Sequence, residues 1–569
     1  MRISISILLI TCTVLAACSQ APQQDPADIV MLNGGVYTVD AGRSWAEAAA
    51  ISDGMIVAVG TNDEIQPYIG DDTEVVDLTG RMAMPGIHDS HVHPLEGGYE
   101  QVHCNLWNES GVDAIIAKLQ ACEKDHEGEW FEAIGLDLGS FGLSGPDKSI
   151  LDSLSQDRYI FVDGSDGHAA LVNDKVLDLL GINENTLDPH DGVIERREGS
   201  REPNGTLRES AREPVDAIRP PRTLEVSVPT MRDAIQLMNS HGITSGFDVW
   251  IRPHELDVYK ILADADELNL RVLGGIYDPI EGDHIDENLE QRVLSRGGYE
   301  SEYVNYNAVK LIVDGVLEGE TAALTEPYHS VDHAGIPFFD TDVFNERVQY
   351  YYDMGMHIHF HAMGDRAVRE AMDAIELARD NGAEELLDNR HTISHMALVD
   401  PSDMHRFAEL NISASVTMIW ATNDEWAQNL DIPAMGIERV ERYYPIRSVQ
   451  QAGGVIVGGS DWNYGDLDPL LSIEAAITRK SPWGPEENME YEGLGDELVD
   501  LATMIDSYTI NGAWQLGIED ISGSIEAGKR ADVIVYNRNL FEIDVHEISE
   551  AIVDLTVFDG RVVHRSDHE

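Results

Sequence analysis

Arg81-Met-Ala-Met-Pro-Gly-Ile-His-Asp-Ser-His-Val-His-Pro94 is an apolar, strand-like stretch that ends in the pair His91 and His93. Side chains two positions apart on a strand point to the same face, so we expect the two imidazoles to lie side by side. Neutral imidazoles in that arrangement form the first half of a metal site. The same spacing also occurs in loops that bind nothing, so the rest of the chain has to supply further ligands.

Strand-like and helix-like patterns alternate along the chain after this stretch. Eight segments are nearly continuous apolar runs, as expected of strands buried on both faces: residues 82–90, 243–249, 271–276, 308–314, 356–361, 391–395, 412–416 and 455–460. Helical periodicity lies between several of them, at residues 344–354, 366–381, 402–410 and 446–452. Eight strands with helical crossovers predict an α/β fold, a (β/α)8 TIM barrel over residues 82–514.

Two further regions flank the predicted barrel strands. About 150 residues separate the first strand from the second, which is far more than an ordinary connection. Residues 96–240 are therefore expected to form an insert over the mouth of the active site. Short strand patterns divided by Gly and Asp occur at both ends of the chain. We expect residues 27–81 and 515–569 to form one small β-sandwich domain, because chain ends commonly lie close together.

The N-terminal residues predict export. Arg2 precedes an apolar run that ends in Leu15-Ala-Ala-Cys18, which is typical of a secretory signal and too short for a membrane span. This segment resembles a bacterial lipobox, which implies removal of residues 1–17, lipidation of Cys18 and a tether over residues 18–26. Ser19 resembles the residue found in lipoproteins sent to the outer membrane. The alternative is a soluble export signal with an incidental cysteine. The expected location is the bacterial periplasm, with a lipid anchor to the membrane.

The charge of the chain excludes some partners. Lys and Arg number 38 against 103 Asp and Glu, for a net charge of −65. Such a field repels nucleic acid and anionic lipid, so no nucleic-acid partner is expected. The acids are dispersed, which favours a hydrated surface suited to a salty, marine or halotolerant source. Cys104 and Cys122 remain after export and lipidation, and the sequence leaves open whether they form a disulfide or two free thiols.

Polar residues at the ends of the predicted strands are the candidate site. The C-terminal ends of barrel strands carry catalytic groups. The residues that would meet there are four imidazoles, one lysine and one carboxylate: His91, His93, Lys310, His361, His395 and Asp461. A single histidine at a strand end is more often a core or rim residue, and Asp461 alone could simply begin a turn. The convergence of all six favours a metal-dependent active site.

These motifs resemble the amidohydrolase superfamily, specifically amidohydrolase family 3, the YtcJ-like metal-dependent hydrolases. The resemblance covers nearly the whole chain after the signal. It rests on the His91-Val-His93 pair and on six further segments, residues 167–173, 203–209, 309–315, 361–367, 459–462 and 528–533. Ser394 departs from the pattern, since relatives often carry Glu just before the histidine of the sixth strand. The departure puts in doubt whether a neighbouring side chain orients the imidazole of His395, but not the role of His395 as a ligand.

The resemblance implies roles for the six residues. His91, His93, His361 and His395 would bind metal, and Asp461 would be both a ligand and the proton-transfer group. Lys310 would bridge two metals if its amine has taken up carbon dioxide as a carbamate, because an ammonium is a poor ligand for a cation. Otherwise a single metal is expected. The imidazole-rich set favours one or two zinc ions, which activate water at neutral pH. His168 and Trp462 are candidate contacts for a small-molecule substrate.

The expected function is hydrolysis of amide-type C–N bonds in N-acyl or N-formyl amines or in cyclic amides. A lactone or ester hydrolase stays open, because the same activated water attacks those carbonyls. A deaminase is disfavoured, because His361-Ala-Met-Gly364 lacks the glutamate that the deaminases of the superfamily carry after the fifth strand. A binding lipoprotein without activity is the alternative from another class. The sequence leaves the substrate and the oligomeric state open, a homodimer included.

Overall fold

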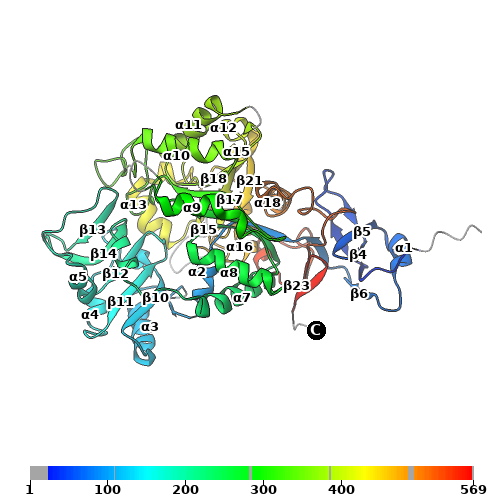
Figure 1. Ribbon diagram of the computed structural model, residues 1–569, viewed down its shortest axis with the longest axis horizontal. Coiled ribbons are helices and arrows are strands. Elements are labelled where there is room, and N and C mark those ends of the chain that lie inside the picture. The colour runs from blue at the N-terminus through cyan, green and yellow to red at the C-terminus, as the bar shows by residue number, and fades with distance from the viewer. Residues whose placement is uncertain are drawn as a thin grey trace, which may run out of the picture.

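The computed structural model describes residues 24–100, 102–107, 109–280, 285–336, 338–383, 386–484 and 493–566. A central barrel lies between two β-rich parts, one on each side (Figure 1). The part that contains β10 to β14 lies at one end of the long axis, and the part that contains β4 to β6 lies at the other. The predicted signal peptide, lipidated Cys18 and most of the tether lie outside the described residues.

The barrel is a nearly closed sheet of eight parallel strands, arranged in the order in which they occur in the chain. Its strands are β8 (Ile87–Val92), β15 (Ile243–Ile251), β16 (Arg271–Tyr277), β17 (Val304–Ile312), β18 (His357–Ala362), β19 (His391–His395), β20 (Ile412–Val416) and β21 (Val455–Gly458). The first and last strands meet where the N–H of Asp461 donates to the carbonyl of His91, at 2.8 Å. The predicted barrel of eight parallel strands is confirmed.

The predicted first strand, residues 82–90, is in fact two strands. β7 (Met82–Pro85) pairs with β22 in a sheet outside the barrel, and β8 begins the barrel at Ile87. Gly86 lies between them, and a Cβ at this position would lie 2.2 Å from the Thr244 hydroxyl. The apolar pattern runs through the break because both strands are buried.

Helices surround the barrel and bury their apolar faces on it. Thr341–Asp353 (α10) and Asp365–Asn381 (α11) match two predicted helices closely. The predicted helix over 402–410 is shorter, because the Asp400 carboxylate accepts from the N–H of Ser402 and closes a turn there. The other barrel helices of five or more residues are α7 (Leu224–Ser240), α8 (Pro253–Asp264), α9 (Glu287–Ser295), α15 (Ile446–Gln451), α16 (Pro469–Thr478), α17 (Leu501–Ser507) and α18 (Ile510–Leu516). The shorter ones are α12 (Arg406–Glu409), α13 (Ile432–Met435) and α14 (Ile437–Val440).

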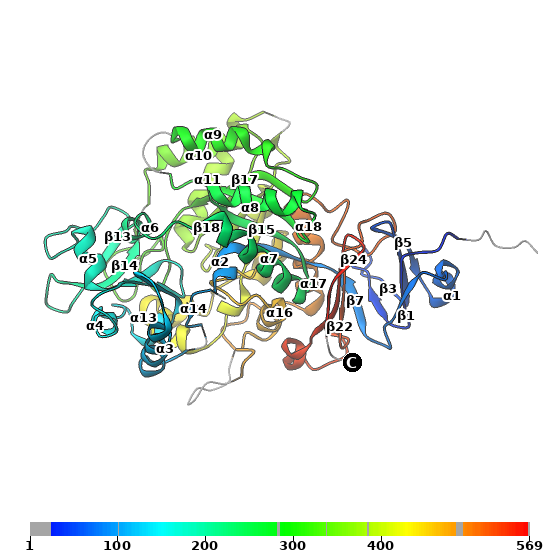
Figure 2. The same cartoon turned by 60° about the horizontal axis from the view of Figure 1, so that its bottom comes forward.

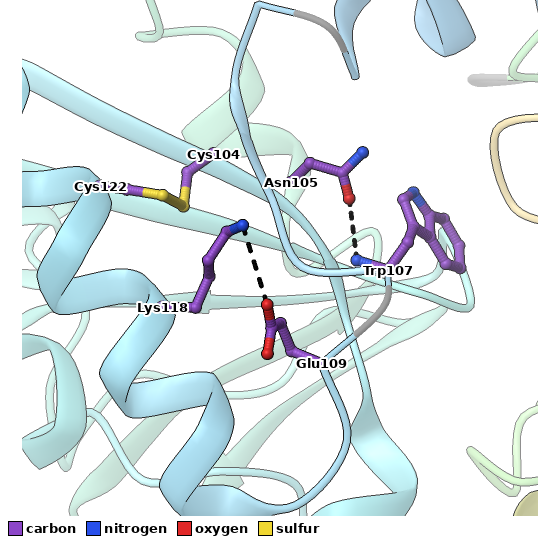
Figure 3. Close-up of a disulfide and its surroundings, with 6 residues drawn as sticks. All are labelled: Cys104, Asn105, Trp107, Glu109, Lys118 and Cys122. Carbon is purple, nitrogen blue, oxygen red and sulfur yellow. Dashed lines mark hydrogen bonds and ion pairs between the residues drawn. A yellow bond between two sulfur atoms is a disulfide. The ribbon is translucent and has the colours of Figure 1, made fainter.

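The region between β8 and β15 contains a six-stranded sheet with the order β13-β14-β12-β11-β10-β9. Its strands are β9 (Cys104–Asn105), β10 (Trp130–Leu136), β11 (Tyr159–Gly164), β12 (Ala169–Val172), β13 (Gly192–Arg196) and β14 (Pro203–Glu209). Its helices are α3 (Val112–Asp125), α4 (Ser149–Asp152), α5 (Asp174–Leu180) and α6 (Glu213–Asp216), and α2 (Pro94–Tyr99) packs with α7. Figure 3 shows the disulfide that joins Cys104 of β9 to Cys122 of α3. It resolves the question that the sequence left open.

The two chain ends form two sheets, with the orders β5-β4-β1-β6 and β24-β23-β22-β7-β2-β3 (Figure 2). The strands are β1 (Ile29–Leu32), β2 (Gly35–Tyr37), β3 (Trp45–Ala46), β4 (Ala48–Ser52), β5 (Met55–Gly60), β6 (Glu74–Asp77), β22 (Val533–Tyr536), β23 (Val553–Phe558) and β24 (Arg561–Arg565), and α1 (Asn62–Ile65) follows β5. Side chains of both sheets share one apolar core. The sandwich packing and the domain boundaries stay predictions. None of the described helices is both long and apolar enough to cross a membrane.

Candidate metal centre

Three of the predicted ligands converge at one end of the barrel. His91 lies on β8, His93 directly follows it, and Asp461 lies three residues after β21. Their ligand atoms all lie within 4.8 Å of one another, and all three residues are buried. Asp461 Oδ1 is 3.1 Å from His93 Nε2 and 3.4 Å from His91 Nε2.

This arrangement fits a metal ion better than it fits hydrogen bonds. Asp461 Oδ1 is buried and makes no well-aligned hydrogen bond, although two imidazole nitrogens approach it. Burial lowers the pKa of His91 well below its usual value, so its imidazole is neutral and keeps a lone pair for a cation. Two imidazoles and a carboxylate are ligands that zinc accepts.

The other two histidines lie beside this group. His395 Nδ1 is 3.7 Å from Asp461 Oδ2, and the rings of His361 and His395 are 4.4 Å apart. Burial lowers the pKa of both imidazoles, to about 3 for His395. His395 and Asp461 have φ angles of +72° and +52°, so both adopt the left-handed conformation that non-glycine residues rarely take. Such strained backbone clusters at functional sites.

Lys310 reaches the same place from β17. Its side chain is almost fully buried, and its charge lowers the pKa of His91, His361 and His395. Burial lowers the pKa of the Lys310 ammonium to about 7, although the carboxylate of Asp461 acts in the opposite direction. A substantial fraction of the side chain is therefore the neutral amine at neutral pH. All six predicted residues are thus together, and their individual roles stay predictions.

The predicted substrate contacts line the same cavity, which has a volume of about 2140 Å³. His168 comes from the loop before β12, and its ring is 4.9 Å from that of His361. Trp462 is buried, packs on Gly97 of α2, and donates its indole N–H to Glu100 at 3.3 Å. His168 thus lies beside the predicted ligand His361, whereas the indole N–H of Trp462 is bound by Glu100.

Glu209, at the end of β14, is a partner of His168 that sequence reasoning did not identify. Its Oε2 is 2.7 Å from His168 Nδ1, and its Oε1 accepts from the Thr321 hydroxyl at 2.7 Å. Burial alone would lower the pKa of His168, but the charge and hydrogen bond of Glu209 raise it to about 9. His168 is therefore protonated at neutral pH. In the sequence, Glu209 was marked only by its position in the segment 203–209, which is part of the family resemblance.

His359 contacts the predicted ligand His91 and was also not identified from the sequence. Its Nε2 is 3.1 Å from His91 Nδ1, the nitrogen that points away from Asp461. Alternation along β18 puts His359 on the same face as His361, so the sequence could have placed His359 near the candidate site. Ser394 donates instead to the carbonyl of Phe360, so it ties β19 to β18 and does not contact His395 through this bond.

Replacing His359 with Gln tests whether His359 supports His91. We expect the affinity for metal to fall by about 10- to 100-fold, because partners of ligating histidines fix ring orientation and tautomer. The loss is measured by competition with a zinc chelator. The matched control is His405→Gln on the surface, which should retain the wild-type affinity. An unchanged affinity in the His359 variant would contradict the supporting role.

Together, the barrel and the donor set are those of a metal-dependent hydrolase, with the predicted ligands at the strand ends. The chain belongs to the amidohydrolase family, whose sequence profile matches residues 74–564. It is 27% identical to the putative amidohydrolase YtcJ of Bacillus subtilis over 548 residues, 93% of this chain and 98% of the relative. It is 26% identical to an N-substituted formamide deformylase of Arthrobacter pascens over 554 residues, 94% of this chain and 97% of the relative.

A solved structure has the same fold. An uncharacterized metal-dependent hydrolase from Pyrococcus horikoshii superposes with a TM-score of 0.70 and 22% identity, covering 91% of this chain and 99% of that one. The likeness supports the barrel with its additional sheets. The family assignment confirms the resemblance to amidohydrolases and with it the class of metal-dependent hydrolases.

Proposed function

We propose that this protein hydrolyses amide-type C–N bonds in N-acyl or N-formyl amines or in cyclic amides. The observation that carries the proposal is the buried group of His91, His93 and Asp461, which opens into a large cavity beside Lys310 and His361. The similarity to a formamide deformylase supports an amide substrate.

The residues of the site have complementary tasks in this reaction. A divalent metal held there supplies the charge that acidifies water and polarises a carbonyl. Asp461 would accept a proton from the attacking water and return it to the leaving nitrogen. His168, kept protonated by Glu209, has its Nε2–H available to donate to the carbonyl oxygen as negative charge develops.

The metal is proposed to be zinc, as one or two ions, because imidazoles dominate the donor set. For two ions Lys310 would act as a bridging carbamate, formed when its amine adds to carbon dioxide and loses a proton. The lowered pKa of Lys310 supports this chemistry, since only the neutral amine is a nucleophile.

We also propose that the protein is a lipoprotein of the periplasm, anchored through Cys18, in the outer membrane. The lipobox-like sequence supports this location. The disulfide between Cys104 and Cys122 is consistent with an oxidising compartment. The proposed partners are a small-molecule substrate and the lipid bilayer.

A substrate panel tests the proposed function. The zinc-loaded chain from residue 19 onward is incubated with N-formyl amines, N-acetyl amines, cyclic amides, esters and lactones, and the released amine or acid is quantified. We expect turnover of at least one amide class, abolished by zinc chelation. Hydrolysis of esters or lactones alone would identify the protein as an ester or lactone hydrolase. No turnover of any compound in the panel would contradict a hydrolytic function.

A further inference from the structure

A second feature of the cavity is a pair of carboxylates in the loops that follow two barrel strands. Glu318 lies in the loop after β17, and Asp431 ends the π-helical turn Ala427–Asp431 after β20. Both side chains line the cavity, although each residue is only 8% exposed. The two loops touch, since the N–H of His329 donates to the carbonyl of Ala434 at 2.8 Å.

These two carboxylates have no cation of their own. Among the described residues, neither side chain forms an ion pair or a hydrogen bond with another side chain. The positive groups that act on Glu318 are His168 and Arg208, which are already bound by Glu209 and Glu195. No positive group of the described residues acts on Asp431, whose pKa is raised well above its usual value by burial and by Glu318 and Asp424. Burial thus disfavours the ionised form of this carboxyl, and a cation bound beside it would favour ionisation.

Aromatic side chains also line the cavity. Trp420 stacks on the metal-site residue His395, with ring centroids 5.8 Å apart. Tyr443 is 1% exposed, lines the cavity, and its hydroxyl has no hydrogen-bond partner among the described residues. The charges of Asp431 and Glu318 both act on Tyr443, so the hydroxyl lies near the two carboxylates. Aromatic faces attract organic cations.

The carboxylates are not arranged for a metal ion. In the part of the chain that the structure describes, only His91, His93 and Asp461 bring their ligand atoms close enough together for one. An ammonium or guanidinium group is larger than a bare metal ion and donates several hydrogen bonds, which suits separated carboxylates and aromatic side chains.

We propose that Glu318 and Asp431, with Trp420 and Tyr443, bind a positively charged group of the substrate, an ammonium or a guanidinium. This deepens the proposed function, on which it rests for the identity of the scissile bond. Trp420 stacks on His395, so a cation held against its indole would lie beside the place of the scissile amide, at His395 and Asp461. The substrate class is then an N-acyl or N-formyl derivative of a diamine or of an aminoalkyl guanidine. The net charge of −65 would also draw such cations toward the protein.

Direct binding tests the subsite without hydrolysis. The probes are n-pentylammonium and its neutral analogue 1-pentanol, titrated calorimetrically into the metal-loaded full-length protein in detergent. We expect one n-pentylammonium per chain, bound at least about 10-fold more tightly than 1-pentanol, and about 10-fold weaker binding in Glu318→Gln and in Asp431→Asn. The control Glu438→Gln removes an exposed carboxylate of α14 and should bind like the wild type.

Three results would overturn the subsite. They are equal binding of the two probes, unchanged binding in both variants, and displacement of n-pentylammonium by an equal concentration of Ca²⁺. Thermal unfolding separates binding from a structural role. Asp431→Asn replaces a buried carboxyl without a side-chain partner by an amide of nearly the same shape, so Tm should stay the same or rise. A lower Tm would mean that the carboxylate has a structural partner and would contradict the proposal.

Hydrolysis then links the subsite to the reaction. N-(5-aminopentyl)formamide is compared with N-hexylformamide, in which a methyl group replaces the ammonium. We expect kcat/KM to favour the cationic amide by about 10- to 100-fold, and the ratio to approach one in the two variants. Hydrolysis of both amides at equal rates would leave the proposed function intact and overturn the cation site. Carboxylate-dependent binding without hydrolysis of any amide would support the cation site and overturn the proposed function.

Discussion

Asp461→Asn is expected to lower kcat by about 10²- to 10⁴-fold, the range typical of losing a general acid–base group. The amide that replaces the carboxylate has nearly the same shape but is a very weak base, so it would not take the proton of the attacking water. It also removes a negative charge next to His91 and His93, where the oxygen now lies 3.1 to 3.4 Å from the two imidazoles. Steady-state kinetics on the best substrate of the panel measures the effect.

Two further measurements separate base chemistry from loss of metal. Metal content is determined on the same Asp461→Asn sample, and activity is also measured with zinc in excess. The control is Asp496→Asn, the same change at a surface carboxylate that is 83% exposed. Wild-type kcat in the zinc-saturated Asp461 variant would show that this carboxylate does not transfer the proton.

Lys310→Ala is expected to lower activity by more than about 100-fold, the upper end for residues that merely support a ligand. The change removes the only group proposed to bridge two metals, and it leaves a space next to Asp461. Added formate or acetate would place a carboxylate in that space and restore part of the activity. Activity with and without the added acid is measured at constant pH and ionic strength.

Rescue of activity by the added acid distinguishes a bridging role of Lys310 from other roles. Lys118→Ala, at an exposed lysine of the insert, serves as the control. Its activity should equal that of the wild type, with and without the added acid. A Lys310 variant with full activity would exclude the bridging role. Loss of activity with no rescue by either acid would favour a single metal, for which Lys310 serves as an amine.

The barrel was predictable because its strands are buried on both faces and therefore appear as continuous apolar runs. The same property hid the break at Gly86, where apolar residues continue from one sheet into another. The sheet of the insert was not predictable in detail, because its strands are short and pair both parallel and antiparallel. The disulfide depended on the approach of β9 to α3, which cysteine spacing alone does not determine.

Site residues at the ends of barrel strands could be predicted from the sequence. Residues outside the barrel strands that contact them or line the same cavity could not. His91, His361 and His395 occupy positions that the barrel topology dictates. Glu209 reaches His168 across 41 residues of sequence, and Glu318 and Asp431 come from loops after different strands. Only the folded chain shows that such residues share a cavity.

Metal content of the wild-type protein is the most direct test of the account. The chain from residue 19 onward is stripped with a chelator, titrated with zinc, and assayed for bound metal by elemental mass spectrometry and for amide hydrolysis. We predict one or two tightly held ions per chain and activity that returns in proportion to their binding. A protein that retains no metal after reconstitution, or that hydrolyses amides equally well without it, would contradict the central claim.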